Sequence, residues 1–399
     1  MTGSIRSLFE RCSLVGTLAL LCGVLACCIL TMNAGTAHAL FTTEVHASNV
    51  HTVKAFPTGL SVDSDGYRAQ SKDIDRAQLT VTATFSDGTS RVLDDDEYEL
   101  SVEAFTSGYK GSLDNEATFI DTGHRVSAPF TVDADEAYGA QYGNVLVFGR
   151  GIPTDTYESK ELKNTSWNIE QGNYSIRWNR NEIVKAVDID TISPLNHMYG
   201  WFNDSTTLQQ VSLTHVDTSR LTSLARVFHN CSALTRVDGI SDWDVSHVTS
   251  LGFMFCNAAS LTSVDLSRWN TVSVRDINCT FQNCSRLTSV GNLHGWNTSN
   301  MNQMGNTFQC CFALTNVGDL SSWNTSNVTW MKEMFQQCTV LANIGDVSGW
   351  NTSKVTNMYQ MMQMSPKLVA NCRNWNVSKV TDHTDFRGSS PNVISPTWS

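Results

Sequence analysis

Aromatic and leucine residues recur at a nearly constant interval through the second half of this 399-residue chain. The phenylalanines are spaced by 26 or 27 positions, at Phe202, Phe228, Phe255, Phe281, Phe308 and Phe335, with Met362 in the next place. Six positions after each comes a leucine, at Leu208, Leu234, Leu261, Leu287, Leu314, Leu341 and Leu368. A third series consists of Trp243, Trp269, Trp296, Trp323, Trp350 and Trp375. Such self-similarity predicts a solenoid, because one repeat cannot bury its apolar face alone and stacked copies can.

The pattern of apolar residues changes within each repeat. Met331, Phe335 and Cys338 fall at helical spacing, and Ser326 precedes them where an N-cap belongs. The preceding repeat contributes a short β-favouring segment, Leu314–Val317, followed by a corner that contains Gly and Ser. We therefore expect one short strand, one corner and one short helix per repeat, in an α+β solenoid of about seven coils.

The segment from Trp323 to Leu341 resembles the repeat of the BspA-type leucine-rich surface proteins. The resemblance covers about residues 195–386, and it implies a leucine-rich-repeat-like, right-handed solenoid on an exported bacterial protein. Family members are associated with adhesion to host matrix proteins and to other microbes. The sequence departs from the family pattern at Met362, and at Ser205, Ala258 and Ser365 in place of cysteine. These departures suggest worn repeats and a C-terminal cap.

Eight cysteines follow residue 230, at Cys231, Cys256, Cys279, Cys284, Cys310, Cys311, Cys338 and Cys372. Cys231, Cys284, Cys311 and Cys338 share one position, three residues after the phenylalanine. Neighbouring parallel coils would hold them about 4.8 Å apart, within reach of a disulfide. A column of buried thiols is the other interpretation. The absence of a Cys-x-x-Cys pair makes a zinc site an unlikely use of these residues.

The N-terminus predicts export. Arg6 and Arg11 accompany an apolar run, Leu14–Leu30, and the small residues of Ala37–Ala39 fit a signal-peptidase site, so we place cleavage after Ala39. Two alternatives stay open. Residues before Cys27 loosely resemble a lipobox, which would give a lipid anchor there, and the apolar run is marginally long enough to be a retained membrane anchor.

The region between the signal and the repeats is predicted to be all-β. Residues 79–85 alternate between apolar and threonine side chains, and Ser86–Thr89 has turn chemistry. Short β-type runs recur at Arg91–Leu93, Leu100–Val102, Ala117–Ile120, Phe130–Val132 and Val145–Phe148. Such spacing favours a β-sandwich, and residues 79–89 resemble the bacterial Ig-like domains, which usually act as spacers.

These patterns divide the chain into five parts. They are a signal peptide (1–39), an Ig-like β-sandwich (40–158), a solenoid N-terminal cap (159–194), the BspA-like repeats (195–386) and a C-terminal tail (387–399).

Composition and motifs exclude several functions. The formal net charge of −11, with no basic stripe, disfavours nucleic acid as a partner. No zinc-protease, nucleophile-elbow, phosphate-loop or dinucleotide motif is present. Asp63–Gly66 begins like a calcium loop, but Ile74 stands where an EF-hand has glutamate, and Asp94–Glu97 is typical of a solvated loop. We therefore expect no catalytic residues, no metal site, no cofactor and no enzymatic activity.

The expected function is binding. By analogy with other leucine-rich repeats, ligand contacts are predicted on exposed strand positions and on a recurring aspartate row. The predicted contact residues are Thr235, Thr262, Thr288, Thr315, Asp238, Asp265, Asp319 and Asp346. The expected partner is a protein or glycan on a host or microbial surface, met by a secreted or surface-held chain. The alternatives are a passive stalk and a cell-wall hydrolase that uses two nearby carboxylates.

Overall fold

The computed structural model describes residues 55–64, 72–106, 109–121, 123–167, 178–199 and 201–398, together with Tyr67, Ala69 and Ile169. The predicted signal peptide and Cys27 lie outside the described residues, as do Asp65 and Gly66 of the calcium-like loop. The chain divides into two compact units. One contains residues 73–104 and 113–132 and the segment before Arg68, and the other contains residues 68–72 and 105–112 and everything from Asp133 onward.

The first unit is built from two three-stranded sheets. One sheet contains β1 (Pro57–Asp63), β2 (Thr80–Phe85) and β3 (Ser90–Val92), and the other contains β4 (Tyr98–Leu100), β5 (Gly111–Asp121) and β6 (His124–Ala134). A short 3-10 helix, η1 (Arg76–Gln78), precedes β2. The strand predicted at 79–85 is confirmed as β2, with Val81 and Ala83 buried on one face. The ring of Phe85 meets that of Phe119 edge-on at 6.2 Å. The Ig-like assignment stays a prediction.

The second unit begins with a seven-stranded sheet in the order β15-β13-β11-β8-β7-β10-β9. Its strands are β7 (Ala137–Tyr142), β8 (Val145–Arg150), β9 (Thr156–Tyr157), β10 (Lys160–Trp167), β11 (Lys185–Asp188), β13 (Gln210–Ser212) and β15 (Arg236–Asp238). Pairing is antiparallel from β9 to β8 and parallel from β8 to β15. The strand predicted at Val145–Phe148 therefore belongs to the solenoid sheet, whereas the sequence placed it in the Ig-like domain.

The reason for this difference lies in the core. Phe148 of β8 stacks on Trp201 at 4.7 Å and meets Phe202 edge-on at 6.0 Å. Phe202 is the first member of the phenylalanine series, so β8 closes the end of the apolar core that the repeats build. The hairpin of β7 and β8 covers surface that the first coil would otherwise expose to water.

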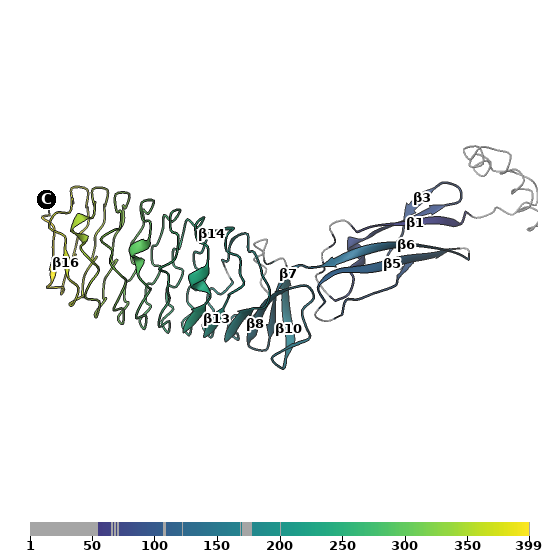
Figure 1. Cartoon of the computed structure of the whole chain (residues 1–399), viewed down its shortest axis with the longest axis horizontal. Helices are drawn as coiled ribbons and strands as arrows, with labels where there is room; N and C mark the ends of the chain where they lie inside the picture. The colour runs from purple at the N-terminus through teal and green to yellow at the C-terminus, as the bar shows by residue number, and fades with distance from the viewer. Residues whose placement is uncertain are drawn as a thin grey trace, which may run out of the picture. The chain divides into compact units, whose positions relative to one another are not determined.

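From β11 onward the chain winds into a β-solenoid of about eight turns, one more than predicted. Figure 1 shows its coils stacked side by side from teal to yellow. Two parallel ladders join successive coils. One passes through β12 (Asn196–His197) and β14 (Leu221–Ser223) and then through single bridges such as Gln303 to Trp330. The other continues from β13 and β15 through Ser263, Ser289 and Asn316. The predicted strand positions are confirmed, mostly as single bridges.

The last coils end in a short closing segment. β16 (Ala370–Asn371) pairs in parallel with β17 (Val393–Ile394). Beyond β17, Trp398 stacks on His383 at 4.1 Å and meets Phe386 edge-on at 5.2 Å. The tail therefore places an aromatic side chain against the final buried phenylalanine.

The predicted side-chain columns form the core of the solenoid. Successive phenylalanine rings from Phe202 to Phe335 stack with centroids 5.2–5.6 Å apart and planes within 13°. Tryptophan rings from Trp269 to Trp375 stack at 5.7–6.5 Å. Each indole Nε1–H donates to a backbone carbonyl of the preceding coil, as from Trp323 to Leu293 at 3.1 Å. Stacking and hydrogen bonding thus link every coil to its neighbour.

The predicted short helix of each repeat is wrong, and so is the α+β class for the solenoid. No α-helix occurs among the described residues; the coils contain only 3-10 turns at η3 (Ile240–Asp242), η4 (Leu293–Gly295) and η5 (Val347–Gly349). Glu333 and Gln337 adopt left-handed φ values of 54° and 60°, which interrupt a helix. Within the same ranges, no helix has the length and apolar character to cross a bilayer.

Hydrogen bonding between coils explains why turns replace the helix. The backbone N–H groups of Met331, Glu333, Phe335 and Gln337 donate to carbonyls of the next coil over 2.8–3.1 Å. In an α-helix those groups would bond within their own segment. Ser326 is also not an N-cap: its own N–H donates to Asn324 Oδ1 at 3.0 Å. A run of tight turns directs side chains inward every three or four residues, and this produced the helix-like spacing.

Amide side chains form a further ladder along these turns. Gln282, Gln309, Gln336 and Gln363 each bond to the next, with 2.5 Å from Gln309 Nε2 to Gln336 Oε1 and 2.9 Å from Gln336 Nε2 to Gln363 Oε1. Identical amides stacked on parallel strands satisfy one another in this way.

The cysteine column consists of buried thiols, and all eight cysteines of the described region are free. Cys311 Sγ donates to Phe281 O of the preceding coil at 3.1 Å, and Cys231, Cys284 and Cys338 make the equivalent bond. Where serine replaces cysteine, Ser365 Oγ donates to Phe335 O at 2.6 Å. Ser365 therefore occupies the same position and makes the same hydrogen bond as the cysteines, with oxygen in place of sulfur as the donor atom. Burial raises the pKa of Cys231 to about 12, so this thiol stays protonated and can donate.

A pair of substitutions at Cys311 tests whether the donor matters. Cys311→Ala removes the donor and leaves a small void, so we expect it to lower the free energy of unfolding by about 1–2 kcal/mol. Cys311→Ser keeps a donor and should cost less. Urea unfolding followed by tryptophan fluorescence measures both, with Ser365→Cys as the reciprocal control. Equal losses for alanine and serine would show that packing alone matters at this position.

Candidate functional site

The predicted threonines form one exposed column on the second ladder. Thr235, Thr262, Thr288 and Thr315 are all exposed, and each hydroxyl donates to a carbonyl of the preceding coil over 2.8–3.4 Å. The hydroxyl oxygen of each residue keeps its acceptor capacity. The structure therefore brings these four residues together as a regular row of acceptors.

The predicted aspartates do not form one uniform row. Asp265, Asp319 and Asp346 each accept the N–H of a serine two residues later, at 2.9–3.0 Å, and so hold the corner turn. Between Asp265 and Asp319, Asn292 Oδ1 accepts the N–H of His294 at 3.0 Å, so a neutral amide interrupts the row of charges. Asp238 differs, because it lies in β15 and pairs with Arg236 at 3.4 Å.

These corner hydrogen bonds control the protonation of the carboxylates. The Ser267 hydroxyl and amide lower the pKa of Asp265, and the amide and hydroxyl of Ser321 lower the pKa of Asp319. Ser348 lowers the pKa of Asp346 in the same manner. All three groups are therefore ionised at neutral pH.

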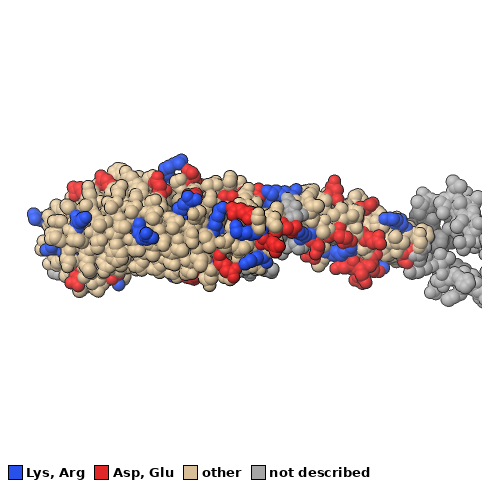
Figure 2. All heavy atoms as spheres, turned by 90° about the horizontal axis from the view of Figure 1, so that it is seen from below, with Lys and Arg blue, Asp and Glu red and all other residues tan. Residues whose placement is uncertain are grey.

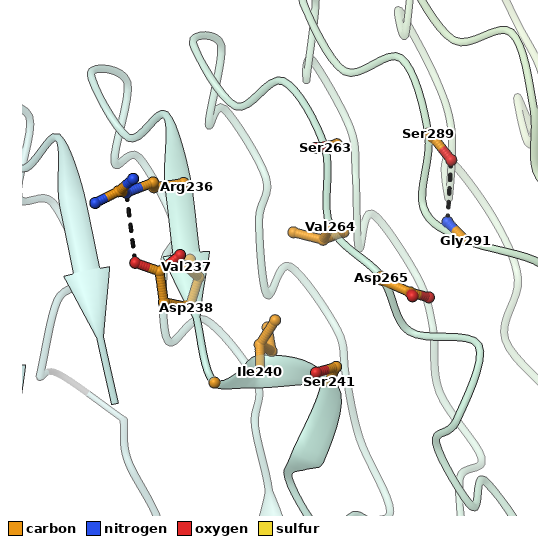
Figure 3. Close-up of a pocket in the computed structure, with 11 residues that line it drawn as sticks. Arg236, Val237, Asp238, Ile240, Ser241, Ser263, Val264, Asp265, Ser289 and Gly291 are labelled. Atoms are coloured by element: carbon orange, nitrogen blue, oxygen red, sulfur yellow. Dashed lines mark hydrogen bonds and ion pairs between the residues drawn. The ribbon is translucent and has the colours of Figure 1, made fainter. Parts of the chain in front are cut away.

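A hollow of about 510 Å³ lies where Asp238 and Asp265 come together. Figure 3 shows its lining: Arg236 and Asp238 from β15, Ile240 and Ser241 from the adjoining corner, and Ser263, Val264, Asp265, Ser289 and Gly291 from the next two coils. Val237, Val264 and Ile240 are almost fully buried and supply its apolar part. Two of the predicted contact residues thus line one concave surface.

The hollow coincides with the shortest of the neighbouring corners. Trp243 follows Leu234 by nine positions, and the same count separates leucine from tryptophan in the coils ending at Trp296, Trp323 and Trp350. Trp269 follows Leu261 by only eight. Val264-Asp265-Leu266 stands where a later coil has Val317-Gly318-Asp319-Leu320. We attribute the hollow to this difference in length. The corner at Val264–Leu266 is one residue shorter than the corners on either side, so it projects less far from the core than they do.

Gly291 completes the wall on the far side. It has a left-handed φ of 83°, and a Cβ there would lie 2.4 Å from Asp265 Oδ1. Only glycine therefore allows the two corners to approach this closely.

Sequence reasoning found Asp238 and Asp265 but missed Arg236, Ser241, Ser263 and Ser289 of the same hollow. The one-residue difference in corner length was the available signal. Asp319 and Asp346 lie in later coils and outside the lining. On the face drawn in Figure 2, Lys, Arg, Asp and Glu side chains are sparser toward the C-terminal end of the solenoid than toward the first unit.

The acidic run Asp94–Glu97 is engaged in bonds within its own segment. Glu97 of the Asp94–Glu97 run pairs with Arg91 at 2.6 Å and accepts the Asp94 N–H at 2.8 Å. In the part of the chain that the structure describes, no group of three or more His, Cys, Asp or Glu side chains could hold a metal ion.

Fold and hollow together define a β-solenoid repeat protein in which the corner at Asp265 is one residue shorter than the corners on either side. A family model described as a Mycoplasma protein of unknown function, DUF285, matches residues 196–317 and again residues 287–394. The two matches overlap within the coils of the C-terminal region, as expected when one unit recurs in register. A comparison with curated proteins gave no match.

The corner aspartates predict a specific acid response. Their pKa values are lower in the folded protein than the usual 3.8, so their ionised forms stabilise the fold above that pH, and the contribution is lost as the pH falls through the folded pKa. Asparagine keeps the turn without titrating, as at Asn292. The triple variant Asp265→Asn, Asp319→Asn, Asp346→Asn should therefore lose less stability than wild type between about pH 4 and pH 2.

Urea midpoints at neutral and acidic pH measure this response. The reverse change, Asn292→Asp, should steepen the acid loss. If the pH dependence of stability is unchanged in both variants, the corner hydrogen bonds do not lower the pKa of these carboxylates on folding.

Proposed function

We propose that this chain is an exported bacterial protein, secreted or held at the cell surface, whose solenoid binds a protein or glycan on host or microbial surfaces. The observation that supports binding most directly is the hollow between Asp238 and Asp265, beside an exposed row of threonines. A rigid stack of coils presents such groups with fixed spacing, which limits the entropy lost on binding.

The sequence supplies the rest of the proposal. The signal-like N-terminus supports export, with a lipid anchor at Cys27 as one means of attachment. The resemblance to BspA-type repeats supports an adhesin-like role. The resemblance of residues 79–89 to bacterial Ig-like domains suggests that the first unit holds the solenoid away from its attachment point.

A cell-wall hydrolase is less well supported. Glycoside hydrolysis needs a carboxylic acid whose pKa is raised so that it can protonate the leaving group. The pKa of Asp265 is lowered instead, by its bonds to Ser267, and Asp238 is ion-paired with Arg236. A passive stalk requires no differentiated corner, so the hollow favours binding over that alternative as well.

Charge reversal in and outside the hollow tests the proposal. Asp265→Lys should reduce attachment of the purified chain to extracellular matrix and to cells by about tenfold or more, because it places a cation where the lining offers a carboxylate. Solid-phase binding to immobilised matrix proteins and whole cells provides the measurement.

Asp346→Lys is the matched control. Asp346 holds its corner through Ser348 as Asp265 does through Ser267, so both variants lose the same kind of turn bond. Attachment should survive in the control. No attachment by the wild-type chain, or equal loss in both variants, would contradict the proposal and favour a stalk.

A further inference from the structure

We propose that the hollow over the short corner is a subsite for one unit of an uncharged glycan, an inference that rests on the proposed binding function. Its volume of about 510 Å³ lies within the usual range of small-ligand sites, roughly 300–1,000 Å³. The ligand class follows from the groups that the lining leaves available.

Hydroxyl groups dominate the available hydrogen-bonding capacity. Ser241 and Ser263 line the hollow, and neither hydroxyl bonds to another described residue. Ser289 Oγ accepts the Gly291 N–H at 3.2 Å, which leaves its own proton to donate. Serine hydroxyls both donate and accept, as sugar hydroxyls do.

One carboxylate oxygen adds a stronger acceptor. Both bonds from Ser267 go to Asp265 Oδ1, at 3.0 Å from the amide and 2.6 Å from the hydroxyl. Oδ2 of Asp265 receives no hydrogen bond from the described part of the chain. A ligand hydroxyl that donates to this oxygen forms a charge-assisted bond, which is stronger than a neutral one.

The charge balance selects against anionic ligands. Arg236 pairs with Asp238 and also donates to Gln210 Oε1 at 3.4 Å, so its charge is already engaged. Asp265 then leaves the hollow with one net negative charge. Sialylated and sulfated glycans would be repelled. A lysine side chain of a partner protein would pair with Asp265 Oδ2 but would leave the hydroxyls of the three serines without a ligand partner.

The apolar part of the lining suits the C–H face of a sugar ring. Val237, Val264 and Ile240 are 7%, 6% and 3% exposed, and they present a small apolar area among the polar groups. Figure 3 shows Val264 and Ile240 between the acidic residues of two coils. A pyranose presents the same combination of an apolar face and a hydroxyl edge.

The test is binding of the full chain to an array of neutral, sialylated and sulfated glycans. An oligolysine peptide serves as the cationic probe. We expect binding to neutral glycans that changes by less than about twofold between 50 and 500 mM salt, because no ion pair holds the ligand. Asp265→Asn keeps the corner turn and should weaken binding by about tenfold. Its matched control, Asp319→Asn, should not.

A second pair of variants changes the shape of the hollow. Inserting one glycine between Val264 and Asp265 recreates the Val-Gly-Asp-Leu corner found at 317–320, so the coil should fold while the hollow fills. Deleting Gly318 converts that later corner into a short one and leaves the original hollow unchanged. Glycan binding should be lost in the insertion variant and kept in the deletion variant.

Two results would overturn the inference. One is hollow-dependent binding only to sulfated or sialylated glycans or to oligolysine. The other is the absence of any glycan whose binding falls in the insertion variant. If matrix attachment still depends on Asp265 in either case, the proposed binding function stands and only the sugar assignment fails.

Discussion

Hydrogen bonds that cross from each coil to the preceding one hold this solenoid together. Three different side chains make the same kind of bond: Trp323 Nε1, Cys311 Sγ and Thr315 Oγ1 each donate to a backbone carbonyl one coil back. Burying one of these carbonyls without such a donor would lower the stability of the fold. The side chains in these columns therefore bond to the backbone of the neighbouring coil as well as packing on one another. Stability in such a stack is mainly a nearest-neighbour quantity, and Phe148 and Trp398 occupy its two ends.

The sequence predicted the columns because stacking repeats residue type at a fixed interval. Phe255, Phe281 and Phe308 are buried in equivalent surroundings, as the spacing required. The backbone conformation is less evident from the sequence than the columns are. Asn230, Asn257 and Asn283 occupy left-handed positions that asparagine tolerates well, but Cys310 and Gln337 hold the same conformation in later coils. Side-chain period alone could not separate a helix from a run of turns, because both point apolar residues inward every three or four positions.

The candidate site was predicted only in part, for a related reason. Asp238 and Asp265 recur near strand ends, so repeat counting found them, together with Asp319 and Asp346, which hold corners outside the hollow. Ser263 and Ser289 look like ordinary polar strand residues in the sequence. What distinguishes them is a neighbouring corner that is one residue shorter, and a search for similarity between repeats discards that difference.

A perfectly regular solenoid offers the same surface at every coil and therefore has no preferred place for a compact ligand. Specific binding requires a departure from the repeat. Substitution changes chemistry at one position, whereas deletion of a corner residue changes shape and exposes groups from three coils at once. The corner of Asp265 does this without disturbing the core, because Leu261 and Trp269 keep their places in the buried columns and Leu266 still donates its N–H to Val290 at 3.0 Å. A corner shorter by one residue thus changes the surface locally while the stacking that stabilises the fold stays intact.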